Sequence, residues 1–224
     1  FVKKGNTLHG VRAMTSNPPS DDSMGSHLGG GRAIRNDGNQ IVVSSLYDPP
    51  TSNGQSNKGV LYTYNYNAES QLWEKEANDV EGTFHLGHVL HLSPNGGELF
   101  ASEIYGTPKL KIFERISDKW ELKQQIDVPQ DLIGAKRWGS FHITPKLDTL
   151  VISDYLGNNN NGYVAVYKRN ANTYEFHSSL ILPQNTASFI ASGVTNNGKI
   201  ILVKSNSLET TITYEYNEDT NVYE

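Results

Sequence analysis

The sequence predicts an all-β protein in which one unit of four short antiparallel strands recurs about every 50 residues. Turn signals give the first evidence. Asp37-Gly38, Asn95-Gly96 and Asn197-Gly198 each stand between apolar runs, where glycine accepts the positive φ of a tight hairpin. The first two glycines are 58 residues apart and the next two are 102 apart, which is twice 51. No segment predicts a helix of more than a turn or two.

The second predicted strand of each unit gives further evidence. These strands are continuous apolar runs, which is typical of strands covered on both faces. They are Ile41 to Val43, Leu99 to Ala101, Leu150 to Ile152 and Ile200 to Val203. An aromatic follows in each unit, and its recurrence indicates packing between units rather than an exposed platform for sugars. These aromatics are Trp73, Trp120, Tyr174 and Tyr223.

A period of about 50 residues with four strands is typical of β-propeller blades. We therefore predict a β-propeller of four to five blades, or a fragment of a larger one. Residues 1–25 form a connector with a short strand, and the repeats occupy roughly residues 26–83, 84–137, 138–188 and 189–224. The strand near Phe1 could complete the last blade and close the ring; the alternative is that the chain is a fragment.

The repeat resembles the FG-GAP type of β-propeller repeat. The residues that carry the resemblance are Leu86-Gly87, Asn95-Gly96, the strand from Leu99, and Gly59 to Tyr64 followed by Trp73. No copy has the Gly-Ala-Pro of that family after the second strand. Some members bind calcium in an Asp-rich loop. Here Asp48 with Asn53, or Asp154 with Asn158 and Asn160, offer too few carboxylates, so we expect no cofactor, calcium being the remaining possibility.

Histidines are the most site-like feature. His91 and His142 are at equivalent positions 51 residues apart, Arg35 takes that position in the first unit, and His27 and His85 are equivalent to each other. All lie on or just before a first strand, which lines the channel of a propeller. They could form a ring that binds an anion, a metal or an acidic ligand; alternatively they are channel residues that only contact water. His85, His88 and His91 cannot converge on one metal without a bend in the strand.

Trp138, beside Lys136-Arg137, is a further candidate for ligand binding, although a core position is the alternative. Two polar loops, at residues 48–58 and 158–162, could contribute contacts from one rim. Motifs for nucleophilic hydrolysis, phosphate binding, zinc proteases and dinucleotide binding are missing from the sequence. Carboxylates from different blades could still meet in a channel.

Composition narrows the class of protein. The chain has 224 residues, 36% of them hydrophobic and 19% charged, with a net charge of −5 and no cysteine. This excludes disulfides and thiolate metal sites, and it disfavours a nucleic-acid partner. No apolar run is long enough to insert into a membrane.

From these observations we expect a non-enzymatic binding or structural module, extracellular or surface-associated, that recognises protein or carbohydrate through its rim loops. The alternative is a secreted enzyme of glycosidase or lyase type with a site at the mouth of the channel.

Overall fold

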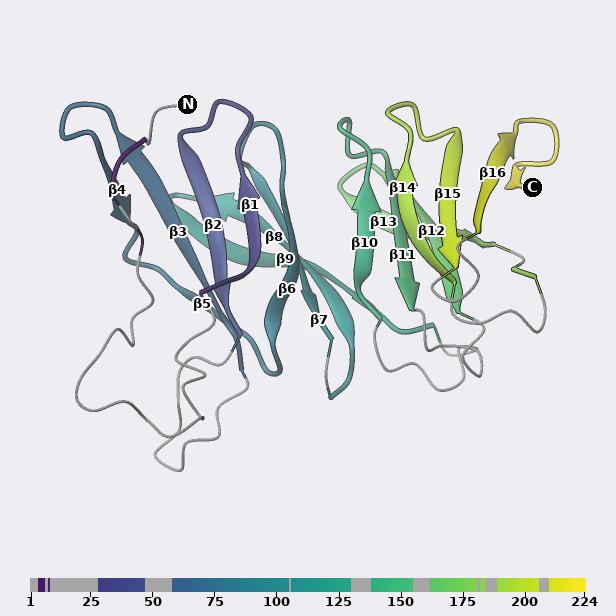
Figure 1. The fold of residues 1–224 in the computed structure, drawn as a ribbon, viewed down its shortest axis with the longest axis horizontal. Coiled ribbons are helices and arrows are strands. Elements are labelled where there is room, and N and C mark those ends of the chain that lie inside the picture. The colour runs from purple at the N-terminus through teal and green to yellow at the C-terminus, as the bar shows by residue number, and fades with distance from the viewer. Residues whose placement is uncertain are drawn as a thin grey trace. The chain divides into compact units, whose positions relative to one another are not determined.

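The computed structural model describes residues 4–6, 8, 28–46, 58–104, 106–129, 138–154, 162–180, 182–183, 189–205 and 210–224. Every regular element in these ranges is a β-strand. None of the described residues belongs to a helix that is long and apolar enough to cross a membrane. The chain divides into two compact units, Phe1–Gly106 with Lys111–Gln125, and Thr107–Leu110 with Ile126–Glu224 (Figure 1).

Nearly all residues of the first two sheets belong to the first unit. The first sheet has the order β1-β2-β3-β4 with β5 beside β3, and the second has the order β6-β7-β8-β9. The strands are β1 (Leu28–Ile34), β2 (Gln40–Ser45), β3 (Val60–Asn67), β4 (Leu72–Lys75), β5 (Val80–Glu81), β6 (Leu86–Leu92), β7 (Glu98–Glu103), β8 (Lys109–Ile116) and β9 (Lys119–Asp127).

The second unit holds the third and fourth sheets, with the orders β10-β11-β12-β13 and β14-β15-β16-β17. The strands are β10 (Ser140–Ile143), β11 (Thr149–Asp154), β12 (Tyr163–Asn170), β13 (Thr173–Ser179), β14 (Phe189–Val194), β15 (Ile200–Ser205), β16 (Thr211–Asn217) and β17 (Val222–Tyr223). Four repeated antiparallel sheets confirm the predicted all-β, propeller-type architecture.

The second strands of the four sheets differ in burial. All six residues of β7 and of β11 are buried, as continuous apolar runs predict. In β2 and β15, burial alternates along the strand instead, so one face of each stays partly open. The expectation that every second strand is covered on both faces is therefore wrong for the first and fourth sheets.

The turn between the first and second strands has one conformation in all four sheets. Gly38, Gly96 and Gly198 have φ of 68°, 74° and 69°. The third sheet lacks this glycine, but Leu147 takes its place with φ of 60°. A left-handed conformation costs a non-glycine residue about 1–2 kcal/mol. Burial of the leucine side chain, together with a 2.6 Å hydrogen bond from the Tyr174 hydroxyl to the Leu147 carbonyl, offsets this cost.

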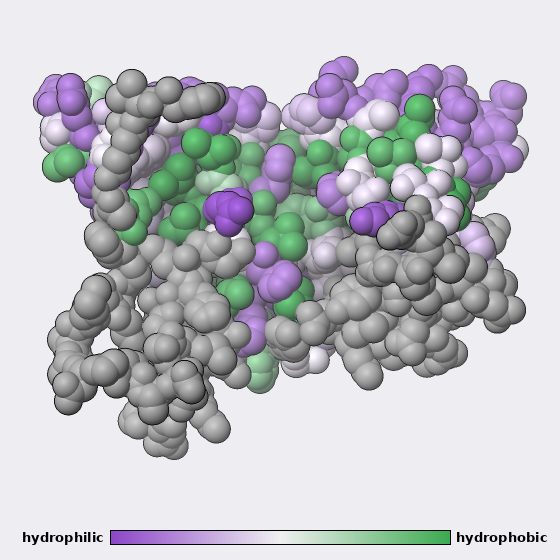
Figure 2. All heavy atoms as spheres, in the orientation of Figure 1, coloured by the Kyte–Doolittle hydropathy of each residue, from purple (hydrophilic) through white to green (hydrophobic). Residues whose placement is uncertain are grey.

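The two sheets of the first unit pack face to face. Val42 and Leu61 of the first sheet share a buried cluster with Leu99, Ala101 and Trp120 of the second. Figure 2 shows hydrophobic side chains over the strands, and hydrophilic ones gathered at the edge that carries the hairpin turns. The indole of Trp120 donates a 2.9 Å hydrogen bond to the Thr63 hydroxyl, so the buried N–H is satisfied across the interface.

Backbone contacts bring these two sheets closer still. The Ser44 hydroxyl accepts a hydrogen bond from the Gly31 N–H at 2.7 Å and donates one to the Gly87 carbonyl at 2.7 Å. A Cβ on Gly31 would lie 2.0 Å from that same carbonyl oxygen. Glycine at position 31 is therefore required by the approach of β1 to β6.

In the second unit, Val151, Val164 and Val166 of the third sheet pack with Ile201 and Val203 of the fourth. Tyr214 and Tyr223 belong to the same buried cluster. Three of the four repeated outer-strand aromatics are thus core residues: Trp120, Tyr174 and Tyr223 are at most 8% exposed. The fourth, Trp73, is only half-buried.

The segment of residues 1–25 lies largely outside the described residues, so its predicted role in closing a ring stays a prediction. Its described residues contact the first sheet. The Asn6 side chain accepts a 2.7 Å hydrogen bond from the Trp73 N–H, and the Lys4 carbonyl accepts one of 3.1 Å from the Trp73 indole. The fourth sheet has an outer strand of its own, β17.

We expect Gly31→Ala to lower the free energy of unfolding by more than 3 kcal/mol, because the new methyl group meets a backbone oxygen that cannot move alone. Gly38→Ala is the matched control. Its Cβ would meet nothing within 4 Å, so only the left-handed backbone is strained, at a cost of about 1–2 kcal/mol. Urea denaturation of both variants measures the difference, and equal losses would contradict the close approach of β1 to β6.

Candidate functional site

His27 and Arg35 are the residues of the first sheet in the predicted ring. The predicted equivalence of Arg35 to His91 and His142 is wrong, because the strand register places Ala33, opposite Val42, at that position. His27 lies outside the described residues. Arg35 follows β1, and its guanidinium binds both carboxylate oxygens of Asp37, at 2.8 and 2.6 Å. This hydrogen bond is the main reason that the pKa of Asp37 falls to about 2 and that of Arg35 rises. Arg35 is therefore committed to its own turn.

His85 lies directly before β6, is buried, and has φ of 48°. Burial lowers its pKa, and the nearby His88 lowers it further. Glu103, at the end of β7, holds the segment that leads into β6. One of its oxygens accepts the N–H groups of Thr83 and Phe84, and the other lies 2.9 Å from the Lys111 ammonium.

His91 and His142 occupy the same position on β6 and β10, but they are held differently. The Nε2 of His142 lies 3.1 Å from the Ala191 carbonyl oxygen of β14. Because a carbonyl only accepts, His142 carries its proton on Nε2 when neutral. His91 instead packs edge-to-face on Phe100, with ring centroids 5.9 Å apart. Its Nε2 is buried and has no hydrogen-bond partner among the described residues.

Burial lowers the pKa of both imidazoles, and in His142 the bond to Ala191 opposes that shift. Both rings are therefore neutral at pH 7, so neither suits the binding of an anion by charge. A neutral imidazole with an unengaged nitrogen can accept a proton, and His91 meets that requirement.

Trp138, the remaining predicted ligand-binding residue, is fully buried and packs against Tyr163 with ring centroids 6.1 Å apart. It is a core residue in this structure. A ring of histidines and Arg35 would combine residues of both units, and it stays a prediction. In the described part of the chain, no group of three or more His, Asp or Glu side chains could hold a metal ion.

Of the predicted calcium ligands, Asp48, Asn53, Asn158 and Asn160 lie outside the described residues. Asp154 is described and ends β11, where it is fully buried. It occupies the position equivalent to Glu103, 51 residues earlier. The sequence analysis missed this pair of buried carboxylates, although the repeat spacing itself relates them.

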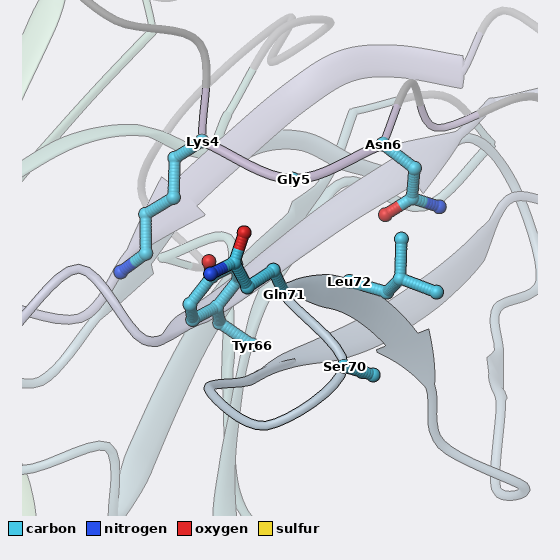
Figure 3. A pocket seen from close by; sticks show the side chains of 7 residues that line it. All are labelled: Lys4, Gly5, Asn6, Tyr66, Ser70, Gln71 and Leu72. Carbon is cyan, nitrogen blue, oxygen red and sulfur yellow. The ribbon is translucent and has the colours of Figure 1, made fainter.

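A cleft of about 660 Å³ opens beside the β3–β4 turn (Figure 3). Its lining combines amide, hydroxyl, aromatic and aliphatic groups: Lys4, Asn6, Tyr66, Ser70, Gln71 and Leu72. The Lys4 ammonium donates to the Gly38 carbonyl at 3.0 Å and to the Asn39 side chain at 2.8 Å, and it lies 4.2 Å from the centre of the Tyr66 ring. The lining can contact a polar molecule, but it contains no acid–base pair for catalysis.

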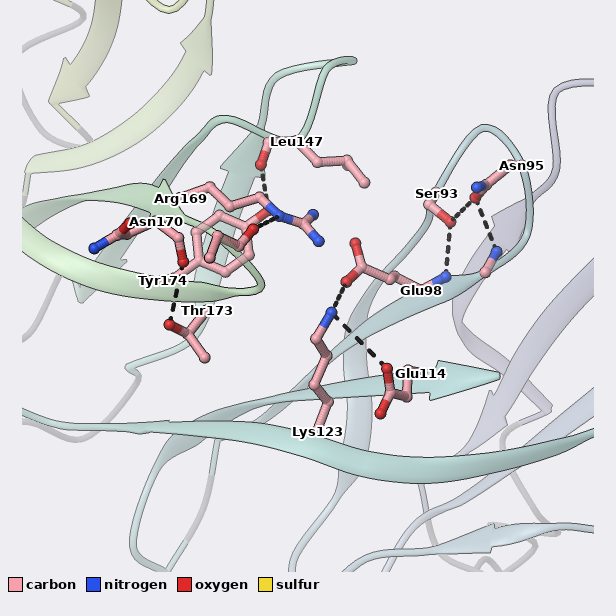
Figure 4. Close-up of polar contacts among 12 residues, drawn as sticks. Ser93, Asn95, Glu98, Glu114, Lys123, Leu147, Arg169, Asn170, Thr173 and Tyr174 are labelled. Carbon is pink, nitrogen blue, oxygen red and sulfur yellow. Dashed lines mark hydrogen bonds and ion pairs between the residues drawn. The ribbon is translucent and has the colours of Figure 1, made fainter. Parts of the chain in front are cut away.

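Other charged groups of the first unit are engaged in holding turns (Figure 4). The Lys123 ammonium lies 2.5 Å from Glu98 and 4.0 Å from Glu114. The Glu98 N–H donates to the Ser93 hydroxyl at 2.8 Å. Ion pairs as shielded as Lys123–Glu98 fix geometry, and their carboxylates are poorly placed to act as acids. Glu76, Glu98 and Glu103 are each paired with a cation, so these shielded carboxylates are not available as the two acids that glycoside cleavage needs.

The comparisons with known proteins define the fold. No protein-family model matches the chain, and no curated protein matches it either. A structure from Bacteroides uniformis, provisionally named a 6-phosphogluconolactonase, is similar with a TM-score of 0.64 and 18% identity, covering 88% of this chain and 53% of that one. A protein from Bacteroides fragilis with the same provisional name gives 0.62 and 18%, covering 94% and 56%. Saccharomyces cerevisiae Sqt1 gives 0.56 and 12%, covering 85% and 46%.

This likeness supports the β-propeller fold, and the chain spans about half the length of these structures. It does not support the FG-GAP type in particular. The expected non-enzymatic binding module is wrong as the main interpretation, because two of the similar structures carry the name of an enzyme. The enzyme alternative is the better supported, on a fold that Sqt1 also has.

We expect His91 and His142 to titrate below the ordinary value of 6.5, because burial disfavours the charged ring. A lowered folded-state pKa means that the stabilising contribution is present above pH 6.5 and is lost as the pH falls through the unfolded and then the folded pKa. Nitrogen-edited NMR of the ring protons checks both values and the tautomer of His142. A pKa at or above 6.5 for both rings would contradict their burial.

Proposed function

We propose that this chain is part of a β-propeller enzyme that hydrolyses a sugar-derived substrate, with a sugar lactone as the first candidate. A lactone is a cyclic ester, so its hydrolysis needs a base that activates water and a donor that stabilises the oxyanion. The proposal rests mainly on one observation: His91 is a neutral imidazole whose Nε2 is not engaged by any described residue. Its repeat equivalent, His142, is tied to the Ala191 carbonyl.

Three further points support this choice of reaction. The names of two structures with this fold refer to a lactonase. Lactone hydrolysis needs one base, whereas glycoside cleavage needs two available carboxylates. Glu98 and Glu103, both buried, are paired with Lys123 and Lys111.

The proposal also covers the type of repeat, the class of ligand and the location of the protein. We propose that the repeats are of FG-GAP type, supported by Gly59, which has φ of 76° directly before β3, and by Trp73 on β4. A carbohydrate-derived ligand and an extracellular or surface location are proposed from the sequence.

The test is hydrolysis of D-glucono-1,5-lactone and its 6-phosphate, followed by proton release at constant pH. We expect His91→Asn to lower kcat by about a hundredfold or more, the usual contribution of a positioned base. His142→Asn is the matched control and should retain kcat within a few-fold. The rate should be constant above pH 6.5 and should fall as the pH drops through the lowered pKa of His91. If the unaltered chain turns over neither lactone, or if His91→Asn retains full activity, the proposal is wrong.

A further inference from the structure

The sheets within each unit meet through two recurring faces. In the first unit, the face of the first sheet that contains Val42, Leu61 and Thr63, here called the covering face, packs on the second sheet. The side of the second sheet that contains Leu99, Ala101 and Trp120 is called the receiving face. Thr63 is 1% exposed and accepts the Trp120 indole N–H at 2.9 Å. One side-chain bond thus fixes the outer strand of one sheet on the third strand of its neighbour.

The second unit repeats this arrangement with different side chains. Val151 and Val166 lie on the covering face of the third sheet, and Ile201 and Tyr223 lie on the receiving face of the fourth. The Tyr223 hydroxyl accepts a 2.9 Å hydrogen bond from Lys168 on β12. In both units, an aromatic of the outer strand is held by the third strand of the preceding sheet.

The covering face of the fourth sheet is open to solvent. Leu202 stands at the position of Val42 and Val151, which are both 0% exposed, yet Leu202 is 37% exposed. Thr213 pairs with Leu202 across β15 and β16, as Thr63 pairs with Val42 across β2 and β3. Thr213 therefore presents, on an exposed face, the hydroxyl that in the first sheet accepts an indole N–H.

The receiving face of the first sheet carries the other half of this contact. Trp73 stands at the position of Trp120, beside Ile41 and Val43, and all three are only half-buried. The N-terminal residues cover part of this face: Leu8 packs on the cluster, and the Lys4 carbonyl accepts the Trp73 indole N–H at 3.1 Å. A backbone carbonyl thus makes the bond that a threonine hydroxyl makes between the first and second sheets.

We propose that a second copy of this chain docks head to tail on the first. The covering face of its fourth sheet, with Leu202 and Thr213, packs on the receiving face of the first sheet, and the Trp73 indole donates to the Thr213 hydroxyl. A second copy is the occupant because one chain carries both complementary faces, and because the same pairing of positions already joins sheets in the first unit. Such a head-to-tail interface closes into a ring or extends into a chain of copies.

The N-terminal residues compete with the second copy for this face. Docking must displace the Lys4 carbonyl from the Trp73 indole, and the Asn6 side chain holds the segment in place through the Trp73 backbone N–H. Association of two copies depends on protein concentration. Because the N-terminal segment competes for the same face, association strengthens when that segment is loosened.

Sedimentation equilibrium over a range of concentrations tests the proposal. We expect the mass to rise above the 24.8 kDa of one chain. Leu202→Lys should weaken association at least tenfold, because it places an unpaired charge in the interface. Leu122→Lys is the matched control: Leu122 is 55% exposed on β9 of the second sheet, outside the two faces proposed to dock, so association should be unchanged. Mass at 24.8 kDa throughout, or equal effects of the two substitutions, would overturn the proposal.

Two more variants and one control test the predicted contacts themselves. Thr213→Val removes the acceptor at constant shape and should weaken association about fivefold, the effect of one hydrogen bond. Thr211→Val, on the same exposed face, is its control and should change association less than twofold. Asn6→Ala loosens the N-terminal segment and should strengthen association about fivefold. Weaker association in Asn6→Ala, or equal effects of the two threonine substitutions, would contradict the proposed geometry. All three side chains are exposed, so each variant should fold.

Discussion

The close approach of β1 to β6 is the constraint on which the first unit depends. Gly31 and Gly87 bring two backbones together, and the Ser44 hydroxyl bridges them with two bonds of 2.7 Å. Packing of Val42 and Leu61 on the second sheet follows from that spacing, because side chains on the neighbouring strands can then interlock. This contact fixes the position of β6, the strand that carries His91.

Equal positions in a repeat do not imply equal chemistry. His91 and His142 share a register position and a lowered pKa, but only His142 has a carbonyl partner. The same holds for Trp73 and Trp120, whose indoles donate to a backbone carbonyl and to a threonine hydroxyl. The scaffold repeats the position of each side chain, and the local neighbours decide what that side chain can do.

The sequence was sufficient for the strands, their order within each sheet and the hairpin turns, because period, turn chemistry and apolar runs are local signals. The third turn lacks this local signal: Leu147 adopts the glycine conformation because burial and the Tyr174 hydroxyl support it. The sequence also could not show that His142 has a carbonyl partner that His91 lacks, since Ala191 lies 49 residues from His142. Such contacts depend on tertiary packing. The non-enzymatic interpretation failed because it rested on the missing catalytic motifs. Enzymes and other proteins share this fold, so the fold does not require a catalytic motif at a fixed spacing in the sequence.

Face-to-face packing of repeated sheets holds each unit together, and burial is most complete in β7 and β11. Native-state hydrogen exchange tests it most directly, because amides in the best-packed strands open only with global unfolding. We expect the amides of β7 and β11, which are buried at every position, to exchange most slowly, and those of β2 and β15 to exchange faster. Equal protection in all four strands, or the slowest exchange in β2 or β15, would contradict it.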